Sequence, residues 1–299
     1  MKNRAIIDIV QGVEMKRASI VALLLISTLS FLGAADFNWG IKYGLGFTGI
    51  YGADSDYELR YNIREHAATV SDYGYIKVSS SDNKMDLSQS AGLYANLRLF
   101  SKTSSIRLGT EVTWDRLVYK QQFRDKVPTT SGLGLSTVFN DKLEGHIAGT
   151  IDYFTVPLLI SFNQELSEEL KQEQYQGAFL YIGPSFSYLY EQTQSKSRGI
   201  DAFSQKVDDY VSNVLSNPDP TVTYSYSRQE TGSDKFKEFK TDLVMGAGFA
   251  LKDLFGFGLG KDEFVFDLRY KVSLDDLGDS GLRDAVGLRS IMLYIGCRL

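Results

Sequence analysis

The feature that most constrains this chain is a series of long segments in which large apolar residues alternate with small or polar ones. The clearest example is the hairpin 153–190. In its second arm Leu180 and Ile182 share one parity, and Gly183 and Ser185 share the other. Because side chains alternate across a strand, this arm has one apolar face and one small, polar face.

The same alternation predicts eight strands, at 39–51, 90–100, 105–118, 153–162, 179–190, 239–251, 263–274 and 287–299. These runs are about 10 to 14 residues long, whereas a typical strand has about 5 or 6. A tilted strand needs roughly 9 to 11 residues to cross a bilayer. Parity cannot separate a soluble barrel, with charges outside, from a membrane barrel, with charges in the lumen. The strand length favours the membrane barrel.

The connections alternate between short turns and long polar segments, which is typical of outer-membrane barrels. The long ones are 52–89, 119–150 and 191–238, and the shorter ones include 101–104, 163–178 and 252–262. We therefore predict an all-β fold, an eight-stranded antiparallel up-and-down transmembrane β-barrel with long external loops. An even strand number places both termini on one side, which we expect to be the periplasm.

The N-terminal region has the pattern of a secretory signal. Met15-Lys16-Arg17 is basic, 18–32 is apolar, and Gly33-Ala34-Ala35 supplies small residues for cleavage after Ala35. The apolar run is shorter than the roughly 20 residues of a membrane-spanning helix, although an uncleaved anchor is the alternative. We predict a mis-start or extension at 1–14, a signal peptide at 15–35 and a barrel domain at 36–299. This places the protein in the outer membrane of a Gram-negative bacterium, in contact with outer-membrane lipid.

Composition limits the alternatives. The net charge of −5 gives no basic footprint for nucleic acid. The single Cys297 cannot form an intramolecular disulfide, and its parity is that of the lipid-facing residues. The 18 Tyr and 18 Phe suit the aromatic girdles of a membrane barrel. Girdle candidates are Tyr43, Trp114, Tyr153, Phe162, Tyr188, Tyr190 and Tyr270.

Two connections have structure of their own. Apolar residues recur at spacings of three and four between Ile200 and Val214, which predicts an amphipathic helix. This helix is either a lid or docking site at the barrel mouth, or it packs against its own loop. The polar segment 164–174 is helix-prone, and we expect a solvated periplasmic turn or a contact with a partner there.

Several motifs resemble PorT-like outer-membrane β-barrels. They are the Tyr-Phe-Thr-Val-Pro-Leu-Leu-Ile strand at 153–160, Leu-Tyr-Ile-Gly-Pro at 180–184, Gly-Ala-Gly-Phe at 246–249 and Asp-Leu-Arg-Tyr at 267–270. The resemblance implies an outer-membrane barrel, and its name-giving member belongs to a protein-secretion and gliding apparatus. The chain departs from the family at Thr155, where members often carry an acid, and at Leu299, where many barrels end in an aromatic residue. Because proline removes a ladder donor and a closed barrel has no edge, we expect a β-bulge at Pro157.

The polar parity also carries ionisable residues, namely Lys42, Arg98, Arg107, Glu111, Asp267, Arg269 and Arg298. An eight-stranded barrel is just wide enough for side chains to fill its interior. Since an unpaired buried charge is costly, we expect these groups to pair into a lumenal network; a proton or ion path is the alternative. In the loops, Tyr57, Tyr61, Tyr73 and Tyr75 are either ordinary packing residues or a carbohydrate-stacking platform.

Enzymatic chemistry has little support in the sequence. A hydrolase needs a nucleophile placed against a base, and the two histidines, His66 and His146, both fall in expected loops. We assign no catalytic, cofactor-binding or metal residues. The predicted function is a non-catalytic barrel that anchors or scaffolds envelope partners, including secretion-machinery proteins. The alternatives are a surface adhesin or ligand-binding barrel acting through its external loops, and a lipid-modifying enzyme. The sequence assigns no oligomeric state.

Overall fold

The computed structural model describes residues 37–51, 58–67, 71–80, 82–98, 105–133, 135–165, 175–215, 222–231, 236–252, 263–274 and 287–298. The expected extension and signal peptide, the turn at 166–174 and Tyr57 lie outside these residues. Within the described ranges, no helix is both long and apolar enough to cross a membrane.

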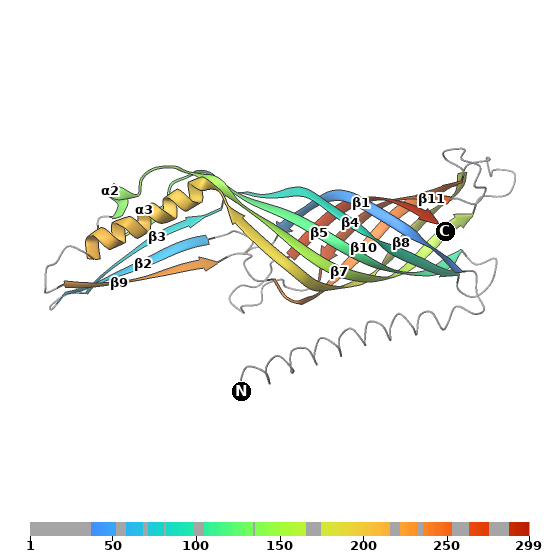
Figure 1. Ribbon diagram of the computed structural model, residues 1–299, viewed down its shortest axis with the longest axis horizontal. Coiled ribbons are helices and arrows are strands. Elements are labelled where there is room, and N and C mark those ends of the chain that lie inside the picture. Colours follow the sequence, from blue (N-terminus) through green and yellow to red (C-terminus); the bar gives the residue numbers. More distant parts are fainter. Residues whose placement is uncertain are drawn as a thin grey trace, which may run out of the picture.

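Eight strands form a closed antiparallel barrel in the order β1-β12-β11-β10-β8-β7-β5-β4 (Figure 1). They are β1 (Phe37–Tyr51), β4 (Asp82–Arg98), β5 (Ile106–Lys126), β7 (Leu143–Glu165), β8 (Tyr175–Lys196), β10 (Phe239–Lys252), β11 (Glu263–Ser273) and β12 (Gly287–Arg298). Strands adjacent in the chain within the barrel also pair, and β1 closes the ring against β12. The predicted fold class is confirmed.

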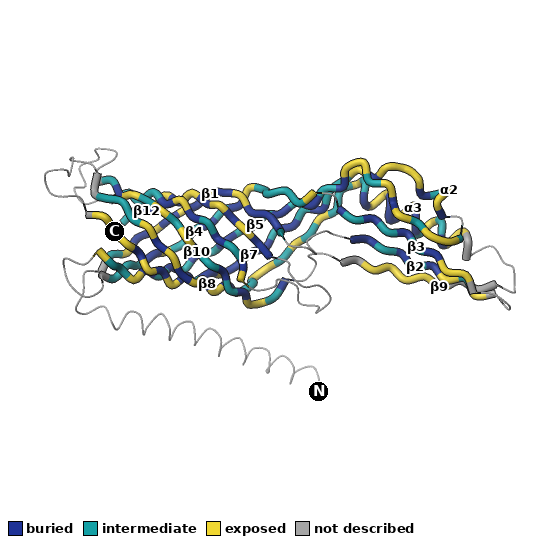
Figure 2. Tube along the Cα trace, turned by 180° about the vertical axis from the view of Figure 1, so that it is seen from behind, coloured by how far each residue is buried: buried dark blue, intermediate teal, exposed yellow. Residues whose placement is uncertain are grey.

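The barrel is apolar outside and polar inside. On β1, Ile41, Tyr43, Leu45 and Phe47 are 47 to 54% exposed, whereas Lys42 between them is 7% exposed. The other barrel strands repeat this alternation, with exposed Leu, Ile and Phe on the outside (Figure 2). Exposing so much contiguous apolar surface while burying lysine is the reverse of a soluble barrel, and it fits a surface solvated by hydrocarbon.

Three strands, β5, β7 and β8, continue beyond the barrel on one side, where a second sheet forms in the order β6-β3-β2-β9 (Figures 1 and 2). Its strands are β2 (Glu58–Ala67), β3 (Ser71–Ser79), β6 (Thr129–Ser131) and β9 (Val222–Thr231), accompanied by α2 (Leu135–Val138) and α3 (Arg198–Leu215). We call this assembly the module. The opposite end of the barrel, where β1 begins and β12 ends, is called the terminal mouth.

The segments 52–89, 119–150 and 191–238, expected to be long loops, are therefore largely strand and helix. β2 and β3 come from the first, β6 and α2 from the second, and α3 and β9 from the third. The ladders pair β2 with β3 and β9, and β3 with β6, so strands from all three connections complete one sheet. Such pairing between distant segments has no local sequence signal, which is why the expectation of loops was wrong.

The module has its own hydrophobic core. Its buried members are Leu59, Tyr61, Ile63, Ile76, Val78, Phe123, Leu135, Phe139, Leu143, Ile147, Ile200, Phe203, Val207 and Val211. The apolar stripe of α3 faces this core, so the predicted helix is confirmed, and it packs against residues from all three connections rather than its own alone. The helix also shields one side of the sheet, and the other side is left open.

No bulge occurs at Pro157. Thr110 pairs with Leu158 and Thr113 with Thr155, so the β5–β7 register is unchanged across the proline. The Thr110 hydroxyl donates to the Pro157 carbonyl at 3.1 Å. The β7–β8 register instead shifts between Asp152 and Tyr153. The expected bulge at Pro157 was therefore wrong, because a missing donor can be accommodated within an unbroken register.

Candidate functional site

Two glycines on the lumenal face make room for two tyrosine rings. Gly44 lies opposite Tyr294, and Gly246 lies opposite Tyr181 in the β-ladders. A Cβ atom at Gly246 would lie 2.2 Å from the Tyr181 hydroxyl oxygen, and one at Gly44 would lie 2.6 Å from the Tyr294 ring. Only glycine permits these close approaches, and they let each ring lie over the neighbouring strand, against the inner wall of the barrel.

The first layer of charges lies beside these rings. Arg269 donates to both oxygens of Glu111, at 2.8 and 3.0 Å, and to Asp267 at 2.8 Å. Lys42 also pairs with Glu111, and the Tyr181 hydroxyl donates to Asp267. All five side chains are buried. Two cations and two carboxylates therefore neutralise one another across the lumen, as charges in a narrow interior must.

A second layer follows toward the module. Lys271 pairs with Asp115 at 3.1 Å and with Asp242 at 3.2 Å. Lys240 lies 2.8 Å from Asp242. The Ser90 hydroxyl donates to Asp115 at 2.6 Å, and the Ser273 hydroxyl donates to Asp242 at 2.9 Å. This layer is again two cations against two carboxylates, with hydroxyls occupying further acceptor positions.

An apolar plug closes the lumen between the second charge layer and the module. Its buried members are Ile50, Leu117, Tyr119, Ile151, Tyr153, Phe236 and Leu288. Phe236, which precedes β10, packs edge-on against Tyr119 with ring centroids 5.7 Å apart.

Tyr153, expected in a membrane girdle, is fully buried and has Lys240 4.8 Å from its ring centroid. That expectation was wrong, because Tyr153 shares the inward parity of Thr155. Tyr43, Phe162 and Tyr190 are exposed, as expected.

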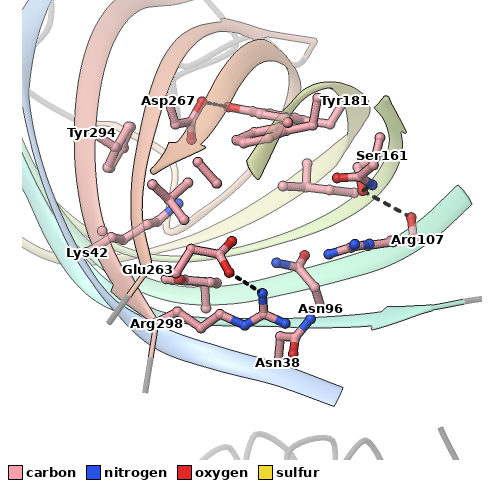
Figure 3. A pocket seen from close by; sticks show the side chains of 18 of the residues that line it. Asn38, Lys42, Asn96, Arg107, Ser161, Tyr181, Glu263, Asp267, Tyr294 and Arg298 are labelled. Carbon is pink, nitrogen blue, oxygen red and sulfur yellow. Dashed lines mark hydrogen bonds and ion pairs between the residues drawn. The ribbon is translucent and has the colours of Figure 1, made fainter. Parts of the chain in front are cut away.

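At the terminal mouth the lumen opens into a polar cavity of about 340 Å³ (Figure 3). Asn38, Asn96 and Arg107 line it, and Arg298 pairs with Glu263 there at 2.6 Å. Tyr94 is 8% exposed, and its hydroxyl makes no hydrogen bond within the described part of the chain. The cavity can hold water or a small polar group, and its floor is the first charge layer.

The predicted lumenal network is confirmed for Lys42, Glu111, Asp267, Arg269 and Arg298. Arg107 faces the cavity, and the Arg98 side chain is outside the described residues. The expected network left out the second layer, which consists of Asp115, Lys240, Asp242 and Lys271, although Asp242 and Lys271 lie on the polar faces of the predicted strands. All four share the lumenal parity of their strands, so continuing the alternation through each strand would have found them.

These layers lead to a prediction about conductance. We expect the purified protein to give no stable conductance steps in planar bilayers, because two paired charge layers and an apolar plug fill the lumen. The double variant Tyr119→Ala/Phe236→Ala, which removes two of the plug's three buried aromatic rings, should also remain closed, since both charge layers are untouched. Stable steps from the wild-type protein would contradict a filled lumen.

The two histidines lie on strands, not in loops. His66 on β2 is exposed, and its Nε2 lies 3.3 Å from the Ser225 hydroxyl. His146 on β7 contacts Ser197 through its backbone amide, which donates to the Ser197 hydroxyl at 2.9 Å. Within the described ranges, no carboxylate is hydrogen-bonded to either imidazole, and no group of three or more metal-ligating side chains forms. The geometry thus gives neither histidine the orienting partner of a catalytic base.

The second candidate site is the side of the module sheet that α3 leaves open, which we call the open face. It carries Glu58, Arg60, Asn62, Arg64 and His66 from β2; Tyr73, Tyr75 and Lys77 from β3; Thr129 and Ser131 from β6; and Ser225, Ser227 and Gln229 from β9. Of the four loop tyrosines, Tyr61 is buried in the module core, whereas Tyr73 is 52% exposed on the open face. The prediction of ordinary packing is therefore confirmed for Tyr61, and the choice between packing and a carbohydrate-stacking platform stays open for Tyr73 and Tyr75.

A closed eight-stranded barrel with an apolar outside and a charged inside is a transmembrane β-barrel. No protein-family model matches this sequence, and no curated protein matches it, so the resemblance to PorT-like barrels remains a prediction.

Among solved structures the chain is similar to three outer-membrane-type barrels. With neisserial surface protein A, identity is 12%, 84% of this chain and 96% of that chain are covered, and the TM-score is 0.30. With OprG of Pseudomonas aeruginosa, identity is 11%, 89% of this chain and 96% of that chain are covered, and the TM-score is 0.35. With Ail, the attachment invasion locus protein of Yersinia pestis, identity is 13%, 88% of this chain and 99% of that chain are covered, and the TM-score is 0.29. Likeness at this level concerns the fold and does not bear on ligand or partner.

Proposed function

We propose that this protein is an outer-membrane β-barrel that holds a folded, ligand-binding module outside the cell. The observation that carries this proposal is the convergence of three chain connections into one sheet–helix unit with a shared core. Loops that only join strands need no common core. An ordered unit above a closed barrel presents a rigid surface, which binds with a smaller ordering cost than mobile loops.

The direction of the module follows from topology and the expected signal peptide. The first barrel strand, β1, begins at the terminal mouth, and the last, β12, ends there (Figure 1). If the chain is exported with a signal peptide, the terminal mouth faces the periplasm and the module faces the medium. The proposed location is therefore the outer membrane, with the module as the exposed part.

A cell-attachment assay tests this proposal. Cells producing the protein should attach to a panel of glycan-coated and matrix-coated surfaces more strongly than cells producing a barrel-only variant. In that variant, short Gly-Ser linkers replace 52–81 and 198–235. We expect attachment to fall to the background level, because the variant lacks the exposed sheet and helix while keeping the filled barrel. Equal attachment by both cell types, with equal amounts in the outer membrane, would contradict the proposal.

The anchoring of an envelope partner is the second candidate, and the polar cavity at the terminal mouth favours it. Amide and guanidinium groups such as Asn38, Asn96 and Arg107 line this cavity and are suited to hydrogen-bond a periplasmic segment. Crosslinking of the tagged protein in isolated outer membranes tests this role. Recovery of one discrete set of envelope proteins by both the full chain and the barrel-only variant would support anchoring. Recovery of the barrel alone would contradict it.

A further inference from the structure

We propose that the open face of the module binds an extended acidic polysaccharide. This inference rests on the proposed function, because it requires the module to face the medium. It adds the chemical class of the ligand and the residues that recognise it.

The open face is positively charged in a chain of net charge −5. Its cations are Arg60, Arg64 and Lys77, and its one carboxylate in the described ranges, Glu58, lies 2.6 Å from Lys77. The opposite, helix-covered side carries both signs: Asp201 and Asp209 are exposed there, and Asp141 pairs with Lys206 at 2.7 Å. The excess of positive charge on the open face attracts an anion to it.

Hydrogen bonds hold the polar groups of the open face in fixed positions. Asn62 Oδ1 accepts from Arg60 Nε at 3.0 Å and from the Tyr73 hydroxyl at 2.6 Å. The Arg60 guanidinium lies 5.1 Å from the centroid of the Tyr75 ring. Within the described residues, the two terminal nitrogens of Arg60 make no ion pair or hydrogen bond. A planar donor pair is therefore held in place and can bind a sulfate or carboxylate in two-pronged geometry.

The spacing of the cations fits a polymer better than a single small anion. Arg60 and Arg64 are four residues apart on one strand, which places their backbones about 13 Å apart. Lys77 lies opposite Arg60 on the neighbouring strand, about 5 Å away. These three cations therefore lie on two neighbouring strands of the same sheet face. A row of anions along a chain can contact several of these cations at once.

The remaining groups of the open face suit sugars. Tyr73 and Tyr75 present rings beside the cations, and sugar rings pack on such surfaces through their C–H faces. Ser131, Ser225 and Ser227 are exposed and supply hydroxyls that donate to and accept from sugar hydroxyls. The combination of fixed cations, aromatic rings and neutral hydroxyls favours an acidic sugar chain over an acidic protein, whose carboxylates are spaced irregularly.

Binding to dextrans tests the inference, because these differ only in their substituents. The full-length protein in lipid nanodiscs should bind immobilised dextran sulfate and should not bind unmodified dextran. The double variant Arg60→Gln/Arg64→Gln should bind at least about tenfold more weakly, since two charge-assisted contacts are removed. Binding should weaken as NaCl is raised, because exposed charges are screened beyond about 8 Å at physiological ionic strength. Comparable binding of carboxymethyl dextran would add carboxylated sugars to the ligand class.

A matched control removes the same number of charges from the other side of the module. Lys142 and Lys206 have exposed side chains, and the double variant Lys142→Gln/Lys206→Gln should bind within about twofold of the wild type. Unchanged chymotrypsin-fragment patterns establish that both variants keep the module folded, because chymotrypsin cuts after aromatic residues and neither variant changes one. Equal weakening by both double variants would overturn the inference, since charge alone and not the open face would then matter.

Two further outcomes would also overturn it. Single-stranded DNA that competes as well as dextran sulfate of equal charge would make the face a general polyanion surface. A folded module that does not bind dextran sulfate or carboxymethyl dextran would show that the ligand class is wrong. In that case, cell attachment that depends on the module would still support the proposed surface function. Cell attachment that does not depend on the module would contradict both the proposed function and the polysaccharide inference.

Discussion

Replacing Arg269 by leucine should lower the free energy of unfolding of the barrel by about 3 to 5 kcal/mol, because it leaves buried carboxylates without their main partner. Arg269 neutralises both Glu111 and Asp267, and its side chain is 4% exposed. The variant removes one positive charge from a layer that balances two cations against two carboxylates. Equilibrium unfolding in urea, followed by tryptophan fluorescence and by circular dichroism in lipid vesicles, measures the loss.

The control lies at the terminal mouth. Arg298 also pairs with one glutamate, Glu263, but its side chain is 27% exposed and water can reach the pair. Arg298→Leu should therefore cost no more than about 1 kcal/mol. A loss of under about 1 kcal/mol for Arg269→Leu as well would show that water solvates the middle of the lumen, and the filled-lumen model would then be wrong.

Replacing Val207 by aspartate should unfold the module and leave the barrel folded. Val207 is fully buried between α3 and the module sheet. An ionised carboxylate there has no cationic partner, and the cost of burying it exceeds what a small core can supply. The barrel is stabilised by its own ladder and lumenal layers. Limited trypsin digestion of membranes should therefore release fragments cut at Arg60 and Lys77, while β10, β11 and β12 remain protected.

A control on the same helix distinguishes the effect of burying a carboxylate from the effect of adding a negative charge. Gln205 is exposed on the same helix, so Gln205→Asp adds the same charge to the solvated side of α3. Its digestion pattern should match that of the wild type. Simultaneous loss of protection in the module and the barrel for Val207→Asp would show that the two fold as one cooperative unit, contrary to the expectation from their separate cores.

The barrel could be predicted from the sequence because its information is local. A strand whose two faces meet different surroundings must alternate, so the position of Leu45 between Gly44 and Gly46 already separates the two faces. The length of the strands then favours lipid on the apolar face. The same alternation identified Glu111, Asp267 and Arg269 as lumenal. It failed at Tyr153, where the amphipathic character of tyrosine allows either side, and where a register shift lies directly before the residue.

The module was not predictable in the same way. The alternation of Leu59, Tyr61 and Ile63 is short, and its pairing partner on one side is β9, more than 150 residues further along the chain. The helix at 198–215 was predictable because its periodicity lies within one segment. What it covers was not, since that face is assembled from several connections.

The sequence by itself therefore determined the membrane barrel, its strand number, the apolar outside and the charged lumen, because each follows from the alternation and the length of single strands. The tertiary structure alone decided which charges pair, that the lumen is closed by an apolar plug, and that three connections form one module. It also decided that Arg60, Asn62, Tyr73 and Tyr75 lie on one open face. These features depend on contacts between residues far apart in the chain, and only the closed fold fixes such contacts.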